Sequence, residues 1–214
     1  MNSLPTNLDQ STHRHWLRVG LRLVIATMAY NVLEACVALW SGVAAGSIAL
    51  VGFGLDSVIE TLAAGVLLWR LRLEMRQVHP ETIEHAEHRV HRFVGVTFLA
   101  LALYVLLQAT WILWQREPPQ ESPLGIILAI ASLIIMPLVA LGKLRTANVI
   151  GSHALRAEAK ETIACSYLSL TLLLGLGANA VAGWWWTDPI AALCMAPWLV
   201  KEGVEGMRGE GCCD

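Results

Sequence analysis

The chain has 214 residues, of which 56% are hydrophobic and 15% are charged, and its formal net charge is −2. With a mean hydropathy of +0.55, this composition is far from that of an average soluble domain, so we predict an integral membrane protein. The sequence contains neither a basic stripe nor a Gly-rich phosphate loop, and we therefore expect no nucleic-acid partner.

Apolar runs of about 20 residues, the length that crosses a hydrocarbon core roughly 30 Å thick, recur along the chain. We expect an all-α polytopic membrane protein with six transmembrane helices within residues 17–204. A polar cytoplasmic segment, residues 1–16, would precede them, and a short Cys-containing tail, residues 205–214, would follow. The predicted spans are Leu17–Leu39, Ser47–Trp69, Phe93–Trp114, Leu124–Leu141, Leu155–Val181 and Pro189–Lys201.

The basic residues predict the orientation of these spans. Every Lys and Arg except Arg116 falls at or beyond the same-side ends of the spans. Because cytoplasmic loops of membrane proteins carry the excess of positive charge, both termini should lie in the cytoplasm. The other side would hold short connections, including "GWWWTDP", whose tryptophans suit the membrane interface. We expect a multi-pass protein of the cell membrane.

Two acids interrupt the second apolar run. Asp56 and Glu60 are spaced i and i+4, so both point from one face of the helix, one turn apart. Asp56 lies roughly 13 Å along the helix from its outer end, near the middle of the membrane. A charge at that depth costs about 2.5 to 3.5 kcal/mol on insertion scales, so such acids usually face a cavity or a partner.

The fifth span carries a second pair with the same spacing, Glu161 and Cys165. Because spans two and five run in opposite directions, Cys165 should lie level with Asp56, and Glu161 level with Glu60. Three carboxylates and one thiolate suit a divalent transition metal, and the sulfur favours zinc, cadmium or related ions over magnesium or calcium. Alternatively, the acids only fix helix packing through hydrogen bonds, and Cys165 is a small buried apolar residue.

Other polar residues are weaker candidates for metal ligands. Asn31 and Glu34 lie at a comparable depth in the first span, and Cys212 and Cys213 end the chain. Asn31 and Glu34 can equally bond between helices, and the terminal thiols can belong to a frayed end. A His-rich segment, His79 to His91, suits either weak metal capture or a solvated charged linker.

Several of these residues carry a family resemblance. The stretch "NVLEACVALWSGVAAGSIALVGFGLDSVIE" resembles the first two spans of the cation diffusion facilitator family of divalent metal exporters, and "TDPIAAL" resembles the Asp-Pro start of that family's sixth span. The family binds its ion between a His or Asp and an Asp of span two and a matching pair of span five. The resemblance implies that Asp56 and Glu60 take the first two positions and Glu161 and Cys165 the other two.

This chain departs from the family pattern in ways that affect function. Glu60, Glu161 and Cys165 replace the usual residues, so the resemblance does not imply which metal is carried. It does imply a homodimer, and the chain looks like a variant without the C-terminal cytoplasmic domain of many members. Dimerisation would then depend on the membrane part.

These observations predict a transporter, not an enzyme, with no bound cofactor. Zinc or a related divalent ion such as cadmium or cobalt would leave the cytoplasm in exchange for protons, since metal and proton compete for the same lone pairs. One alternative is a membrane scaffold or accessory subunit whose acids only pack helices. Another is a thiol enzyme, which is disfavoured because no intramembrane histidine could serve as a base beside Cys165.

Overall fold

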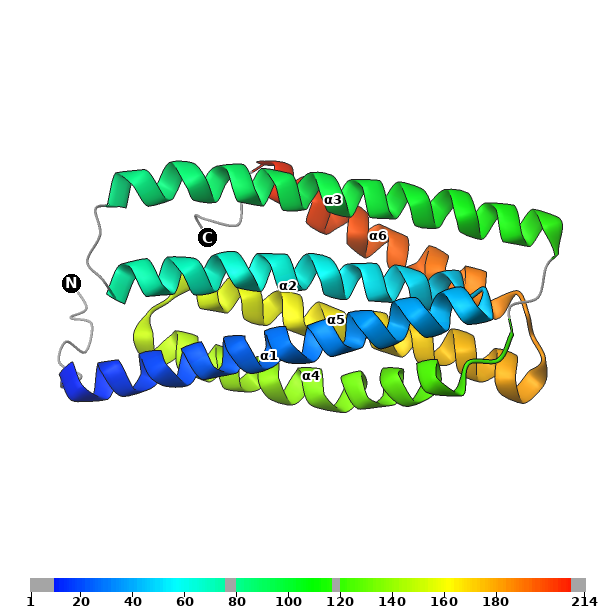
Figure 1. Ribbon diagram of the computed structural model, residues 1–214, viewed down its shortest axis with the longest axis horizontal. Coiled ribbons are helices and arrows are strands. Elements are labelled where there is room, and N and C mark those ends of the chain that lie inside the picture. Colours follow the sequence, from blue (N-terminus) through cyan, green and yellow to red (C-terminus); the bar gives the residue numbers. More distant parts are fainter. Residues whose placement is uncertain (1–9, 76–79, 117–119, 209–214) are drawn as a thin grey trace, which may run out of the picture.

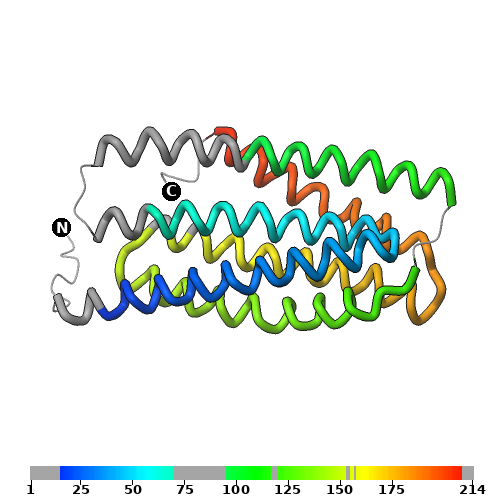
Figure 2. The backbone as a smooth tube through the Cα atoms, viewed as in Figure 1, coloured from blue at the N-terminus to red at the C-terminus, as the bar shows by residue number. Residues whose placement is uncertain are grey.

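The computed structural model describes residues 10–75, 80–116 and 120–208 (Figure 2). Side chains are described for residues 15–69, 95–116, 120–152, 155–156 and 158–208. Six helices account for nearly all of these residues, and the described part of the chain has no strand. They are α1 (Gln10–Ala45), α2 (Ile48–Met75), α3 (Pro80–Gln115), α4 (Pro123–Ile150), α5 (His153–Ala182) and α6 (Thr187–Arg208).

The helices run up and down and form a long bundle (Figure 1). Helices α1, α3 and α5 point one way, and α2, α4 and α6 point the other. The most extensive contacts join α4 to α5, α3 to α6 and α1 to α2, while α2 also contacts α3, α5 and α6. Figure 1 shows α3 above the other helices and α6 running obliquely from the level of α2 up to α3. The second helix therefore lies at the centre of the molecule.

The helices suit a membrane, as the composition predicts. Five of the six are long and apolar enough to cross one, and α6 is the exception. Its 22 residues span roughly 33 Å at 1.5 Å per residue, but they include Asp188, Lys201, Glu202, Glu205 and Arg208. The expectation of an all-α, multi-pass membrane protein is confirmed.

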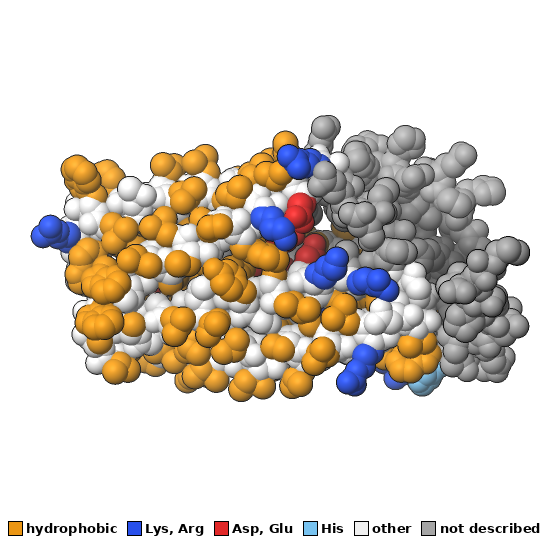
Figure 3. Space-filling model, turned by 180° about the vertical axis from the view of Figure 1, so that it is seen from behind, with side chains coloured by type: hydrophobic (Ala, Val, Ile, Leu, Met, Phe, Trp, Pro, Cys, Tyr) orange, Lys and Arg blue, Asp and Glu red, His pale blue; other side chains and the backbone are white. Residues whose placement is uncertain are grey.

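Large apolar side chains cover the outside of the bundle. Trp40, Leu107, Trp114, Leu138 and Val181 are among those with more than half of their surface exposed. In Figure 3 such side chains cover much of the described face, while basic side chains gather between its middle and the grey part, apart from one at the opposite end. An apolar exterior with basic side chains toward one side is what a lipid-embedded bundle with the predicted orientation requires.

Most helices extend beyond the predicted spans. The first begins at Gln10, the third at Pro80, and the fourth and sixth continue to Ile150 and Arg208. Hydropathy marks only the part of a helix that lies in hydrocarbon, whereas polar residues continue the same backbone hydrogen bonding outside it. The predicted linker from His79 to His91 is thus helical from Pro80 onward.

A buried carboxylate joins α2 to α6. Asp188 accepts hydrogen bonds from the Ser47 hydroxyl, at 2.5 Å, and from the Ile48 backbone nitrogen, at 3.0 Å. Ser47 in turn accepts a bond from the Leu50 backbone nitrogen at 3.1 Å. Asp188 therefore satisfies the first turn of α2 while lying in the first turn of its own helix, where a negative charge is favourable.

Glycines allow α3 and α6 to approach each other closely. A Cβ on Gly95 would lie 2.7 Å from the Met207 backbone nitrogen and 2.8 Å from the Gly203 carbonyl oxygen. Neither backbone atom can rotate away as a flexible side chain would. By contrast, a Cβ on Gly65 in α2 would meet nothing within 4 Å.

The variant Asp188→Ala should unfold at a lower temperature in detergent, because it leaves the buried Ser47 hydroxyl and the Ile48 N–H without an acceptor. The expected loss is about 1 to 3 kcal/mol. Thermal unfolding followed by size-exclusion chromatography measures it. The exposed carboxylate of Glu205 on the same helix provides the control Glu205→Ala, whose effect should be small. Equal effects of the two variants would contradict this role for Asp188.

The variant Gly95→Ala should separate α3 from α6 and lower the thermal stability clearly, since the added methyl group meets backbone atoms. Gly65→Ala adds the same group to a helix with open space around it, so its stability should stay close to that of the wild type or rise slightly. Side-by-side melting curves of the two variants in one detergent test this. A Gly95→Ala protein as stable as Gly65→Ala would show that the contact is not close in solution.

Candidate metal site

Three of the predicted ligands meet between α2 and α5. One oxygen each of Asp56 and Glu60 and the Cys165 sulfur all lie within 4.8 Å of one another. Asp56 and Glu60 point from one face of α2, one turn apart, and α5 presents Cys165 to that face. The antiparallel course of the two helices thus joins residues that are more than 100 positions apart in the sequence.

The group lies inside the protein. Asp56 is 3% exposed and Cys165 is fully buried. The Asp56 Oδ2 atom is buried and has no hydrogen-bond partner among the described residues. A buried carboxylate oxygen without a donor is rare in native proteins, and a cation is one of the few groups that can compensate it.

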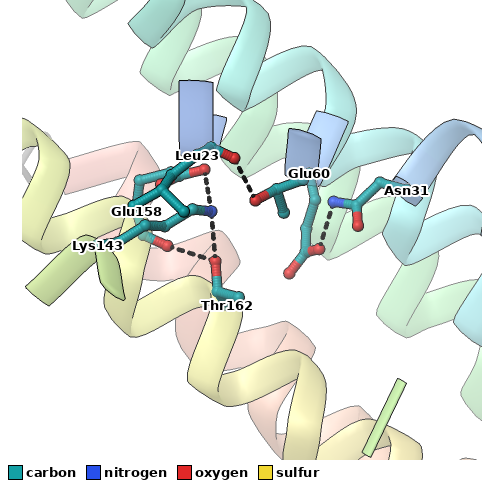
Figure 4. Close-up of polar contacts among 7 residues, drawn as sticks. Leu23, Asn31, Glu60, Lys143, Glu158 and Thr162 are labelled. Carbon is teal, nitrogen blue, oxygen red and sulfur yellow. Dashed lines mark hydrogen bonds and ion pairs between the residues drawn. The ribbon is translucent and has the colours of Figure 1, made fainter. Parts of the chain in front are cut away.

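Asn31 of α1 holds the second acid in place. Its amide nitrogen donates a hydrogen bond of 2.9 Å to Glu60 Oε2 (Figure 4). The amide oxygen, Asn31 Oδ1, is also buried without a partner among the described residues. Asn31 therefore orients the Glu60 carboxylate directly and offers a further oxygen nearby.

The fourth predicted ligand, Glu161, lies one turn before Cys165 on α5. Its carboxylate is not part of the group of three, and the residue is partly exposed. It is nevertheless close enough to interact electrostatically with Asp56 and Glu60. Glu161 therefore adds negative charge beside the group and would need to move to become a ligand.

Glu34 of α1 is fully buried and interacts electrostatically with all three members of the group, but unlike Asp56 it has a hydrogen-bond donor on each oxygen. The hydroxyl groups of Ser57 and Ser132 both donate to its carboxylate, one bond to each oxygen. The Tyr30 hydroxyl pairs with Ser132 at 2.8 Å. These hydrogen bonds connect α1 with α2 and α4, and a role of Glu34 as a metal ligand stays a prediction. The sequence pattern gave no signal for these serines.

Lys143 lies in a position that the sequence did not predict. It counts among the basic residues that define the cytoplasmic ends of the spans, yet it is fully buried. Its ammonium donates to Glu158 Oε1 at 2.6 Å and to Thr162 Oγ1 at 2.9 Å (Figure 4). Hydropathy could not predict this, since Lys143 is only two residues beyond the predicted end of its span.

The group of three can hold one transition-metal ion after a small adjustment. Ligands of a tetrahedral zinc ion, at about 2.0 to 2.3 Å from the metal, are roughly 3.3 to 3.8 Å from one another. The ligand atoms of the group lie within 4.8 Å of one another, an upper limit about 1 Å longer than the distances in such a zinc site. Side-chain rotations can close this difference. Two carboxylates and a thiolate are a donor set that borderline-soft ions accept.

The remaining candidates cannot be placed. Cys212 and Cys213 lie outside the described residues, and so do the side chains of the His-rich segment from His79 to His91.

Cys36 and Cys194 are exposed. An apolar cavity of about 220 Å³ between α5 and α6, bordered by Thr171 and Cys194, does not include any residue of the group of three.

Known proteins resemble this chain over most of its length. Relatives include an uncharacterized transporter of Synechocystis sp., 29% identical over 69% of this chain and 49% of its own length. Metal tolerance protein 4 of Oryza sativa is 26% identical over 79% of this chain and 44% of its own. Transmembrane protein 163 of Xenopus laevis is 26% identical over 74% of this chain and 52% of its own length. The chain spans about half the length of these curated relatives.

The match to a protein-family model covers more of the chain than the match to any of these three relatives does. The cation efflux transmembrane domain matches residues 24–208, which include all three residues of the buried group and all six helices in whole or in part. The chain therefore belongs to the cation efflux transmembrane domain family.

Proposed function

We propose that this protein carries divalent transition-metal ions across a membrane, with Asp56, Glu60 and Cys165 as the core of the substrate site. The observation that supports this most is the convergence of three ligand atoms within 4.8 Å inside a bundle of membrane helices. Family membership and relatives named metal tolerance proteins point in the same direction. Glu161 would complete the site by rotating toward it.

The ion that best suits this donor set is zinc or a related ion such as cadmium or cobalt. Sulfur selects softer ions, while the carboxylates keep enough negative charge to attract a divalent one. Exchange for protons would follow from the same chemistry, because carboxylates and thiolates bind metal only when they are deprotonated. Export from the cytoplasm and a homodimeric assembly stay predictions.

The alternative of a non-transporting scaffold has one observation in its favour. Glu34 is a buried acid with a hydroxyl donor on each oxygen, as an acid that only packs helices would have. Asp56 differs from Glu34, since its Oδ2 atom has no donor among the described residues. An acid that only packs helices should have donors, so we favour the transporter.

Replacing the acids without changing their size tests the site. Asp56→Asn and Glu60→Gln should each lower zinc and cadmium uptake into proteoliposomes by about tenfold or more, because each removes a charged ligand. A metal-sensitive dye inside the vesicles reports uptake, with and without a pH gradient. The exposed carboxylate variant Glu205→Gln is the control. Wild-type rates in both acid variants would refute this assignment, and no ion flux in the wild type would favour the scaffold.

The thiol should determine metal preference. Cys165→Ser replaces a soft sulfur with a hard oxygen, so cadmium binding should weaken roughly tenfold relative to manganese binding. Isothermal titration calorimetry of the purified protein measures both affinities. Cys194→Ser alters an exposed thiol outside the group and should leave the ratio unchanged. If the cadmium-to-manganese ratio is the same in both variants, Cys165 is not a ligand.

A further inference from the structure

A buried ion pair lies beside the proposed substrate site. The Lys143 ammonium on α4 is 2.6 Å from Glu158 Oε1 and 2.9 Å from Thr162 Oγ1, both on α5 (Figure 4). Lys143 is fully buried, and the Glu158 side chain is 9% exposed. Among the residues whose side chains are described, Lys143 is the only buried basic one. Glu158 Oε2 has no partner among the described residues.

The pair is close to the substrate site along α5. Glu158 and Thr162 precede Cys165 by seven and three residues, or about 10 Å and 4.5 Å at 1.5 Å per residue. Glu161 lies in the same turn as Thr162. The Lys143 ammonium also attracts the carboxylates of Glu60 and Glu161 electrostatically. The Lys143 ammonium thus lies at one side of a site that would bind a positive ion.

Stability alone does not explain this arrangement. Burying two charges carries a desolvation cost that their attraction often fails to recover, so apolar residues of similar size would usually serve packing as well or better. Lysine is also a compact charge on a flexible four-carbon chain, which can shift between neighbouring carboxylates. Its charge has the same sign as that of a divalent metal ion.

We infer that Lys143 is a built-in competitor of the divalent substrate ion, and that Glu158 holds it aside. When docked on Glu158 and Thr162, the ammonium weakens metal binding enough to allow release. Without Glu158 as a dock, it would turn toward Glu161 and Glu60 and compete for them directly. This inference rests on the proposed function and adds to it two residues that would set the affinity without touching the metal.

The two halves of the ion pair should therefore have opposite effects on affinity. Lys143→Met removes a positive charge, so the dissociation constant for cadmium should fall by about tenfold. Glu158→Gln frees the ammonium, so that constant should rise by about tenfold. The charge-balanced double variant should return to within a few fold of the wild type. Calorimetric titration of the full chain in detergent with cadmium chloride measures all three.

The controls separate charge from folding. Lys143→Arg and Glu158→Asp keep both charges and should bind cadmium almost as the wild type does, and they stay informative if Lys143→Met fails to fold. Lys201 and Glu205 form a matched exposed pair on α6, at 3.6 Å, so Lys201→Met and Glu205→Gln should leave the affinity unchanged.

The results that would overturn this inference differ from those that would overturn the proposed transport function. A purely structural ion pair would make both single variants weaken binding together, and this result would overturn the inference. Single variants that match the exposed-pair controls would overturn it as well. If the wild-type protein binds no cadmium, the proposed function fails first, whereas normal wild-type binding with unaffected variants refutes only the role of Lys143.

Discussion

The cost of holding charge inside an apolar bundle governs this molecule. Carboxylates, a thiol and an ammonium lie among helices whose outer surface is covered by large apolar side chains. In such surroundings each charge needs a donor, an opposite charge or a bound cation. The structure contains the first two situations, since Glu34 has hydroxyl donors and Glu158 has Lys143, whereas Asp56 has an oxygen without a donor among the described residues. Since Glu158 Oε2 and Asn31 Oδ1 are likewise without a partner among the described residues, the convergence of Asp56 with Glu60 and Cys165 is what distinguishes the proposed substrate site.

The helices around the site have separate tasks. The pair α2 and α5 supplies the converging ligand atoms, and α1 orients Glu60 through Asn31. Helix α4 contributes Lys143 and Ser132, which contact α5 and α1 respectively. Helices α3 and α6 pack closely through Gly95 and Gly203, while Asp188 ties α6 to the start of α2. Asp188 thus links α6 to the helix that carries Asp56 and Glu60.

Much of the candidate site could be predicted because periodicity and topology combine simply. Spacing of i and i+4 places Asp56 with Glu60 on one helix face, and alternating spans make α2 and α5 antiparallel. The meeting of Asp56, Glu60 and Cys165 follows from these two facts. The place of the Glu161 carboxylate did not follow, because Glu161 lies one turn from Cys165 on the same face of α5 and the orientation of its side chain, which spacing does not encode, decides whether it joins the group. The network around Glu34 was also missed, because serines in apolar runs carry no signal of their own.

The sequence by itself determined the all-α membrane class, the approximate spans and the acids that interrupt them, because hydropathy and helical spacing are local properties. Tertiary structure decided which polar groups find partners. It buried Lys143 against Glu158, although basic residues near span ends usually reach the water, and it left Asp56 Oδ2 without a donor among the described residues. Those outcomes depend on how α1, α2, α4 and α5 rotate and pack against one another, which no single segment encodes.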